Sequence, residues 1–456
     1  MRRRGLWLGL LIGLVLGLTL NAVPARSNSE DWDALVEEFF KPLAWLVAQV
    51  DDSYVEPVDR HKLLVGAYQG MLSTLDRYCA FWPEEQVREF EADLEGQFGG
   101  LGIQITWDPI NKAIRVEQPI AGMPAFREGV LAGDLIVEVK EDSTGAVTKI
   151  EALETVHDAI RILRGKPGTK VTVTVIHSES GKKEDITITR ELIKIPGVRA
   201  VGMIDAERKI GYVYIPYFSK PMVEDLKKAV RDLENQGARG IILDLRLNPG
   251  GLLKAAEDCT DLFLRGGVIV SVKGRDGSEE VHKARRGAVF GDIPLVIVID
   301  RFSASGAEIV AAALRDNGRA KLVGESTFGK ASVQTVMDNP TIPGTAIKLT
   351  IARYYTPKGQ LIEGKGVAPD VEIKLSEEDT RKLARHLSMK TDYPPPAPGK
   401  PAPKPENGEE KEAAPEGPFR DVQLERAVQV MAEVLGEPAP APAEEPAAAA
   451  AAATPG

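Results

Sequence analysis

Two stretches of the chain carry side chains that together could perform nucleophilic catalysis. Ser305 follows an apolar run that ends at Asp300, and it precedes a helix-like segment that opens with Gly306. Unpaired amides at the start of a helix favour negative charge, so a serine at such a turn is well placed to act as a nucleophile. The alternative that stays open is that Ser303 or Ser305 only caps the helix.

A serine nucleophile needs a base, and Lys330 is the candidate. It follows Phe328 and Gly329 in an apolar, glycine-rich setting, where burial can lower the pKa of a lysine enough for it to act as a general base. Gln334 could orient the ammonium group without adding charge, although a lysine considered alone is most often a surface residue. None of the five histidines occupies a strand-end turn of this kind; they are His61, His157, His177, His282 and His386.

A second strand-to-helix turn lies in the sequence LDLRLNPGGLL at 243–253. Gly250 and Gly251 have no side chains to cover the backbone there, so an amide of this turn could approach a substrate carbonyl closely. Two strand ends that each offer an amide make an oxyanion hole geometrically reasonable. The alternative is that these glycines form a simple turn.

Neither metal chemistry nor nucleic-acid binding is indicated. The two cysteines, Cys79 and Cys259, lie far apart and in no metal-ligand spacing, which favours buried free thiols over a bridging pair. The formal net charge of −10 argues against nucleic acid as a partner. A serine nucleophile with a lysine base needs neither a metal nor a cofactor, and we expect neither.

The turns that carry these residues belong to a region, 193–376, in which strands and helices alternate. Apolar, strand-like runs lie at 210–218, 240–248 and 294–300, and a helical pattern lies at 222–237. This order predicts an α/β core.

Residues 96–192 have a different pattern, with several strands and two short helices. Residues 169–177 alternate with period two, and 153–165 read as an amphipathic helix. We interpret 96–192 as a self-contained module. The preceding segment, 28–95, is predicted to be helical and to serve packing or dimerisation.

Both ends of the chain differ from the middle in composition. Residues 1–27 combine three arginines, an apolar run at 5–20 and small residues, which predicts a secretory signal or a membrane anchor. The remaining chain is therefore expected to be exported, to the periplasm or cell envelope. Towards the C-terminus we expect a short helical segment at 377–390, a Pro-rich linker at 391–418, an amphipathic helix at 419–436 and a disordered tail at 437–456.

The sequences SASGAEI at 303–309 and GESTFGKASVQ at 324–334 resemble the signature of the carboxy-terminal processing peptidases. These are the tail-specific serine proteases of family S41, which use a Ser–Lys dyad. The resemblance assigns Ser305 as the nucleophile, Lys330 as the general base and Gln334 as its partner.

The same resemblance assigns the oxyanion amides to Gly251 and Gly306. It implies a crotonase/ClpP-like α/β protease core with an inserted α+β PDZ domain and an N-terminal helical segment. Two positions depart from the family pattern: Gly306 replaces an alanine, and Ala331 replaces a glycine. If residue 331 has positive φ, alanine costs about 1 kcal/mol there.

The module at 96–192 resembles a PDZ domain. Its residues Gly100, Leu101, Gly102 and Ile103 match the loop that captures a terminal carboxylate by backbone amides, and the next strand offers an edge for β-augmentation. The expected substrates are proteins or peptides with free, apolar C-termini. The alternative is that the glycines form only a hairpin turn and the module is a spacer.

Other functions and partners stay open at this point. An inactive PDZ scaffold or adaptor would not need Ser305, Lys330 and Gln334 together. A hydratase or isomerase could use a crotonase-type core, but the export signal and the PDZ-like module argue against a coenzyme A substrate. Self-association and an adaptor protein remain open as partners.

Overall fold

The computed structural model describes residues 34–120, 122–153, 155–178, 180–285, 287–389 and 419–437. The chain divides into two compact units, Met1–Leu75 and Asp76–Gly456. The expected signal or anchor at 1–27, the expected linker at 391–418 and nearly all of the expected tail at 437–456 lie outside the described residues. Within the described residues, no helix combines the length and apolar character needed to cross a bilayer.

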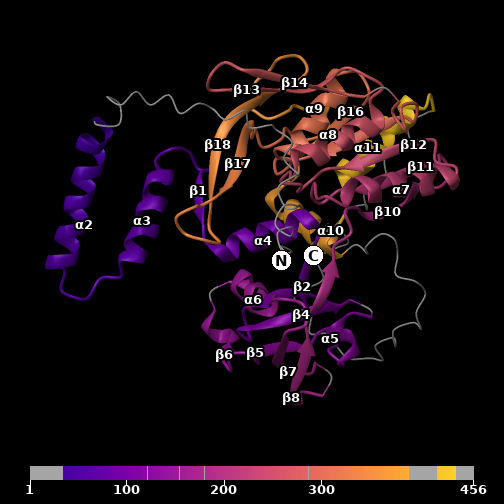
Figure 1. Cartoon of the computed structure of the whole chain (residues 1–456). Coiled ribbons are helices and arrows are strands. Elements are labelled where there is room, and N and C mark those ends of the chain that lie inside the picture. Colours follow the sequence, from indigo (N-terminus) through magenta and orange to yellow (C-terminus); the bar gives the residue numbers. More distant parts are fainter. Residues whose placement is uncertain are drawn as a thin grey trace, which may run out of the picture. The chain divides into compact units, whose positions relative to one another are not determined.

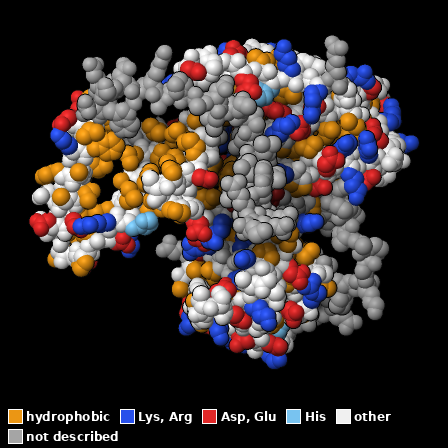
Figure 2. Space-filling view, viewed as in Figure 1, with side chains coloured by type: hydrophobic (Ala, Val, Ile, Leu, Met, Phe, Trp, Pro, Cys, Tyr) orange, Lys and Arg blue, Asp and Glu red, His pale blue; other side chains and the backbone are white. Residues whose placement is uncertain are grey.

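The first unit is helical in its described part. It contains η1 (Val36–Phe40), α2 (Lys41–Ser53) and α3 (Arg60–Ser73). Asp59 caps α3 by accepting the amide of His61 at 2.8 Å. Figure 2 shows hydrophobic side chains gathered over α2 and α3, and the large exposed ones are Leu35, Val36, Phe39, Phe40, Trp45, Leu46, Val47, Tyr54, Val55, Leu64, Met71 and Leu75.

The second unit opens with β1 (Ala80–Trp82) and α4 (Glu84–Glu95), which lead into the inserted module. The two ends of the module meet in a ribbon, where β2 (Gln97–Gly100) pairs antiparallel with β9 (Glu191–Lys194). The amide of Ile195 also donates to the carbonyl of Gly96 at 2.8 Å. The module is thus attached to the rest of the unit through one two-stranded neck.

The module itself is a sheet covered by short helices. The strand order is β3-β4-β5-β7-β8, with β6 paired to β5, so β3 is an edge strand of this sheet. The strands are β3 (Ile103–Asp108), β4 (Ala113–Pro119), β5 (Leu135–Glu141), β6 (Val147–Lys149), β7 (Lys170–Ile176) and β8 (Lys183–Thr189). The helices are α5 (Pro124–Arg127), η2 (Ile150–Ala152) and α6 (Val156–Leu163). Val171, Val173 and Val175 of β7 are all fully buried, as the alternation of that segment predicts.

The larger sheet carries the candidate turns. Its order is β10-β11-β12-β15-β16-β19, in which β11 to β19 run parallel and β10 is antiparallel to β11. The strands are β10 (Arg199–Asp205), β11 (Ile210–Tyr214), β12 (Gly240–Asp244), β15 (Leu295–Ile299), β16 (Lys321–Gly324) and β19 (Val371–Glu372). The parallel strands and the helices between them confirm the predicted α/β character.

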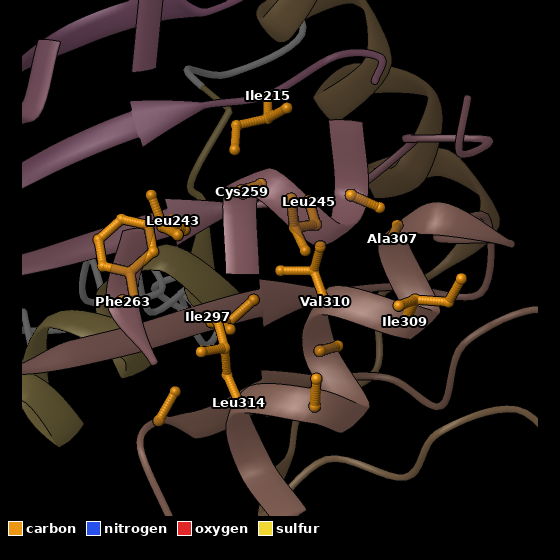
Figure 3. Packing of buried hydrophobic residues seen from close by; sticks show 14 of the residues in the cluster. Ile215, Leu243, Leu245, Cys259, Phe263, Ile297, Ala307, Ile309, Val310 and Leu314 are labelled. Carbon is orange, nitrogen blue, oxygen red and sulfur yellow. The ribbon is translucent and has the colours of Figure 1, made fainter. Parts of the chain in front are cut away.

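Both faces of this sheet are buried under helices (Figure 1). On one face lie α7 (Met222–Asn235), α8 (Leu253–Phe263) and α9 (Gly306–Asp316), and Figure 3 shows α9 packed against strand residues Leu243 and Ile297. On the other face lie α10 (Glu377–Met389) and α11 (Val422–Val434). Strands covered on both sides read as continuous apolar runs, which explains IILD in β12 and LVIVI in β15.

The sequence predicts the helix α11 but not the surface that covers its apolar face. The region 193–376 was expected to form the core, with the amphipathic helix of 419–436 beyond a linker. The structure instead packs α11 directly on the core sheet, with Leu424, Ala427, Val430 and Met431 in the same buried cluster as Ile242. An apolar helix face is stable only when it is covered, and the sheet face that also carries α10 covers it.

A second sheet lies beside α8 and α9. Its order is β1-β18-β13-β14, and β17 pairs with the other side of β18. The strands after β1 are β13 (Val268–Gly274), β14 (Glu279–Lys283), β17 (Ser332–Asp338) and β18 (Ala346–Tyr355). Because β17 begins just after Lys330, this sheet brings the predicted base to the edge of the α/β core.

Candidate active site

Three turns meet at one edge of the α/β sheet. They follow β12, β15 and β16, which are adjacent parallel strands. The carboxyl ends of adjacent parallel strands lie at the same edge, where α/β proteins place their ligand sites. The turn after β12 contains Gly251, the turn after β15 contains Ser305, and the turn after β16 leads to Lys330. Residues separated by up to 79 positions in the sequence are therefore neighbours.

Ser305 occupies the position immediately before α9, as predicted. Its backbone has φ 54° and ψ −112°, a conformation that non-glycine residues rarely adopt. Strained strand-to-helix turns of this kind hold a nucleophile's side chain at the surface of a site. Ser303, the alternative serine, is fully buried, and its hydroxyl donates to the carbonyl of Leu245 at 2.8 Å. Ser303 is thus a structural residue, and Ser305 is the serine that is partly open to solvent.

A buried carboxylate joins the nucleophile's turn to the lysine's turn. Glu308 Oε2 accepts the amide of Ser305 and the amide of Lys330, each at 2.8 Å. Its other oxygen, Oε1, accepts the amide of Gly329 at 2.7 Å and the hydroxyl of Thr327 at 2.5 Å. Burial raises the pKa of the Glu308 carboxyl, while these donors act in the opposite direction. One oxygen thus holds the backbones of residues 305 and 330 together.

Tyr354, on β18, contacts both turns as well. Its hydroxyl is hydrogen-bonded to the carbonyl oxygen of Lys330. Burial raises the pKa of Tyr354 well above its usual value, and a hydrogen bond from Ser305 acts in the opposite direction. The serine side chain therefore lies against the phenol oxygen in this structure.

Lys330 is half-buried, and its Nζ lies 4.8 Å from the centroid of the Tyr78 ring. Burial lowers the pKa of Lys330, and the charge of Lys348 lowers it further, while nearby carboxylates oppose the shift. Among the described residues no hydrogen bond joins Lys330 Nζ to Ser305 Oγ. The direction of the pKa shift suits a base that must be neutral, whereas the side chain is directed toward an aromatic ring.

Gln334 lies on β17, but the structure does not place its amide on Lys330. Its Nε2 donates to the hydroxyl of Ser332 at 2.8 Å and to that of Thr350 at 3.4 Å. The expected hydrogen bond by which Gln334 would orient the Lys330 ammonium group is therefore not formed in this conformation. The register explains the contact, because Gln334 is paired with Thr350 across the β17–β18 ladder.

The glycine turn after β12 lies directly against Ser305. A Cβ placed on Gly250 would come within 2.7 Å of Ser305 Cβ, and one placed on Gly251 within 2.4 Å of the carbonyl oxygen of Phe218. Both glycines have positive φ, 106° and 138°. Within the described residues, the amides of Gly251 and Gly306 donate to no acceptor. Two unpaired amides thus lie beside the candidate nucleophile.

Polar side chains that carried no role in the sequence analysis lock these turns together. Asn248 accepts the amide of Ala304 through its backbone carbonyl at 2.9 Å, and its Oδ1 accepts the amide of Gly250 at 2.8 Å. Asp300 Oδ1 accepts the amides of Leu247 at 3.1 Å and Ser303 at 2.9 Å. The signal in the sequence was a polar residue at the end of each apolar strand, in LDLRLN and in VIVID.

Known proteins share this chain's sequence over most of its length. Residues 209–373 match the profile of peptidase family S41. The chain is 37% identical over 331 residues to the carboxy-terminal-processing protease of Bartonella bacilliformis, covering 72% of this chain and 73% of that protein. The chain belongs to the carboxy-terminal processing proteases of peptidase family S41. It is accordingly a serine peptidase.

Two further relatives carry related names. The carboxy-terminal processing protease CtpA of Bacillus subtilis is 34% identical over 331 residues, covering 72% of this chain and 68% of that protein. Among solved structures, the photosystem II D1 C-terminal processing protease is 28% identical, with a TM-score of 0.43, covering 76% of this chain and 91% of that chain.

The two departures from the S41 motif are both accommodated. Gly306 begins α9, and a Cβ there would lie 3.3 Å from the Phe218 ring and 3.4 Å from Ala256 Cβ. Residue 331 is not among the positive-φ positions of the described residues, so the strain considered for Ala331 does not arise. Neither change therefore places a non-glycine residue at positive φ in this carboxy-terminal processing protease.

The PDZ-like loop of this protease precedes the edge strand β3. Gly102 has φ 73°, and a Cβ there would come within 2.3 Å of Met123 Cβ, so only glycine fits. The carbonyls of Leu101 and Gly102 accept the amides of Ala125 and Ile120, at 3.0 and 2.8 Å. In the described part of the chain, the amides of Leu101 and Gly102 themselves have no acceptor. Ile103 then begins β3, whose partner is β4.

Proposed function

We propose that this chain is a Ser–Lys endopeptidase that processes or degrades exported proteins recognised at their C-termini. The observation that carries the proposal is the shared carboxylate of Glu308, which holds Ser305 and Lys330 side by side. Gly250 lies against the same serine, and within the described residues the amides of Gly251, which follows it, and of Gly306 donate to no acceptor. This combination supplies a nucleophile, a base and an oxyanion site without a metal.

In the proposed reaction, neutral Lys330 takes the proton from Ser305 as the hydroxyl attacks the scissile carbonyl. The amides of Gly251 and Gly306 hold the negative oxygen of the tetrahedral intermediate. Lys330 then gives the proton to the leaving amine, and water hydrolyses the acyl-enzyme. Before the first step, the lysine side chain rotates from the Tyr78 ring to the serine, and Gln334 turns toward the lysine.

Recognition is proposed to occur in the module at 96–192, acting as a PDZ domain. The unpaired amides of Leu101 and Gly102 would bind the terminal carboxylate, and the peptide would add to the free edge of β3. Half-buried apolar side chains of Ile103, Ile105 and Val156 pack at the surface of the module's core and suit an apolar C-terminal residue. The peptidase core is further proposed to be crotonase/ClpP-like, and export is proposed from residues 1–27.

The catalytic part is tested with a fluorophosphonate probe and a peptide substrate. Wild-type protein should be labelled at Ser305, and Ser305→Ala and Lys330→Ala should each abolish turnover while the circular dichroism spectrum is unchanged. An inactive scaffold would give no labelling in the wild type. Substantial turnover by the Lys330→Ala protein would rule out the dyad.

The recognition part is tested with one peptide and its C-terminally amidated form. Charge-assisted hydrogen bonds to a carboxylate contribute about 1.5–3 kcal/mol, so the free acid should bind roughly tenfold or more tightly. Equal affinity and equal cleavage of the two peptides would show that the module does not read the carboxylate. The dyad could stand even if this result removed the tail-specific part.

A further inference from the structure

The turn that carries Gly251 contains an arginine that is completely buried. Arg246 lies between the end of β12 and the glycines, and its side chain has no exposed surface. Its Nε and Nη2 donate to the carboxylate of Asp244, at 3.0 and 2.6 Å from the nearer oxygens. Burial alone would lower the pKa of Arg246, but the carboxylates of Asp244 and Asp421 raise it above its usual value. The guanidinium is therefore charged and held by its ion pairs.

The second partner of Arg246 comes from the far end of the chain. Asp421, which precedes α11, binds the guanidinium through both oxygens, with Nη1–Oδ1 at 2.7 Å and Nη2–Oδ2 at 2.8 Å. Gln423 Oε1 accepts from Nη1 at 3.2 Å. The two partners are separated from Arg246 by 175 and 177 residues. A paired geometry of this kind fixes the orientation of the guanidinium as well as its position.

The start of α11 is itself fixed, so it can serve as an anchor. Asp421 Oδ1 also accepts the amide of Leu424 at 3.0 Å, which caps the helix. Gln423 is fully buried and donates to the carbonyl of Ile373, beside β19, at 2.8 Å. The helix then packs along the sheet through Met431, whose sulfur lies where a side chain on Gly240 would be. These contacts hold both the start of α11 and its later turns against the core.

Arg246 in turn stands at the point where the catalytic turn departs from regular strand geometry. Leu247, the next residue, has φ 59°, which is costly for a residue with a branched side chain. Gly250 and Gly251 follow with φ 106° and 138°. Glycine adopts positive φ without strain, so the strain of this turn lies at Leu247, which holds its conformation only while its neighbours support it. Asp300 and Asn248 support it by accepting the amides of Leu247 and Gly250, and Arg246 ties it to the start of α11.

We propose that Asp421 acts through Arg246 as a positioning residue for the amide of Gly251. The C-terminal helix α11 is then part of the catalytic apparatus, although it touches neither the substrate nor the reacting atoms. The inference rests on the proposed oxyanion role of Gly251. It differs from a purely structural role of the ion pair in one respect: loosening the pair must slow the chemical step in molecules that are fully folded.

The test uses the full-length protein with Asp421→Asn, Asp421→Glu and, as control, Glu425→Gln. Asparagine has nearly the same shape as aspartate, but its Nδ2 must face a guanidinium N–H, so one of the two paired bonds is replaced by a donor–donor contact. Glutamate keeps the charge but shifts it by one methylene. Glu425 lies in the same first turn of α11 and pairs at the surface with Arg420, so the control removes one carboxylate of the same helix without touching Arg246.

For Asp421→Asn we expect kcat to fall about 10- to 100-fold, with KM within about twofold of wild type, since a misplaced oxyanion donor affects mainly the transition state. Asp421→Glu should recover part of kcat, and Glu425→Gln should match wild type. Melting temperatures and circular dichroism, recorded with each assay, establish that the molecules compared are folded.

The outcomes separate this inference from the proposed function. If the wild type is not labelled at Ser305 by a fluorophosphonate, the proposed function fails. If the wild type is labelled and Asp421→Asn is folded with a normal kcat, only the positioning inference fails. If Asp421→Asn does not fold, Asp421→Glu decides: a reduced kcat at unchanged KM supports the inference, and wild-type kinetics overturn it.

Discussion

Replacing Glu308 by glutamine should reduce catalysis and shift its pH dependence at the same time. The carboxylate accepts two hydrogen bonds at each oxygen, and the amides of Ser305 and Lys330 share Oε2. Glutamine has one acceptor oxygen and an NH2 group, so at least one backbone amide loses its acceptor. If the glutamine oxygen keeps its hydrogen bonds with the amides of residues 305 and 330, its NH2 group faces Thr327 and Gly329. The Thr327 hydroxyl can rotate to accept a hydrogen bond from the NH2 group, but the amide of Gly329 is left without an acceptor.

The size of the effect follows from these contacts. Leaving one buried donor unpaired next to a former charge lowers the free energy of unfolding by about 1.5–3 kcal/mol. Displacement of the loop that carries Lys330 by about 1 Å can reduce catalysis roughly 100-fold, so we expect kcat/KM to fall by about 10- to 100-fold. The ionised Glu308 opposes the lowering of the Lys330 pKa, so its removal lowers that pKa further. Because the neutral lysine is the active form, kcat/KM rises with pH through this pKa, and the acid limb should move to lower pH in Glu308→Gln.

The assay is kcat/KM of a fluorogenic peptide measured across pH, with Glu363→Gln as the matched control. Glu363 also opposes the lowering of the Lys330 pKa, but among the two turns it holds only the amide of Ala331, at 2.9 Å. The control should therefore show a shift of the acid limb in the same direction with a smaller loss of rate. A Glu308→Gln protein with wild-type kcat/KM, or with its acid limb moved to higher pH, would refute the reasoning.

The remaining predictions concern Lys330 and the two glycines. Burial lowers the pKa of Lys330, so its charged form destabilises the fold at pH values below that pKa. Lys330→Met should therefore be inactive but have a higher melting temperature at neutral pH, by about 2–4 °C for each kcal/mol gained. A lower melting temperature would contradict this. Gly251→Ala should reduce kcat by about 100- to 1,000-fold, because its Cβ would lie 2.4 Å from the Phe218 carbonyl oxygen and displace the amide. Gly306→Ala should keep near-normal kinetics, because residue 306 is not among the positive-φ positions and its Cβ, 3.3 Å from the Phe218 ring, requires only a shift of a few tenths of an ångström. Comparable losses in both glycine variants would argue against the geometry of the turn.

The sequence predicted those parts of the site that depend on local order. An apolar strand followed by small residues and a helical pattern placed Ser305 at the start of α9, and glycines after β12 indicated the second turn. Whether these turns meet depends on β12 and β15 being neighbours in a parallel sheet, which the alternating pattern predicts only as a class. The apolar, glycine-rich setting of Lys330 made it the candidate base for Ser305, and the resemblance to a peptidase family assigned the same pair.

Contacts between distant residues could not be predicted in the same way. Glu308 stood in the quoted motif without a role, because most of its donors come from a distant turn, residues 327–330, rather than from its own helix start. The pairing of Arg246 with Asp421 spans 175 residues and leaves no periodic signal. The apolar face of the last helix predicted burial, but not the surface that buries it. The side-chain directions of Lys330 and Gln334 depend on Tyr78 and Thr350, which belong to elements assigned to no part of the site.

The two-stranded neck formed by β2 and β9 has a consequence for how the inserted module can be exchanged. Because Gly96 and Ile195 are hydrogen-bonded across the neck at 2.8 Å, the whole inserted module begins and ends at one point on the peptidase. The entropy lost on closing a loop depends on bringing its two ends together. Here the two ends of the module are already as close as the two strands of a hairpin. A different ligand-binding fold with adjacent termini could therefore replace this one without stretching the catalytic turns. Exchange of the module at residues 96 and 195 is thus a route, by evolution or by engineering, to new binding domains on an unchanged peptidase core.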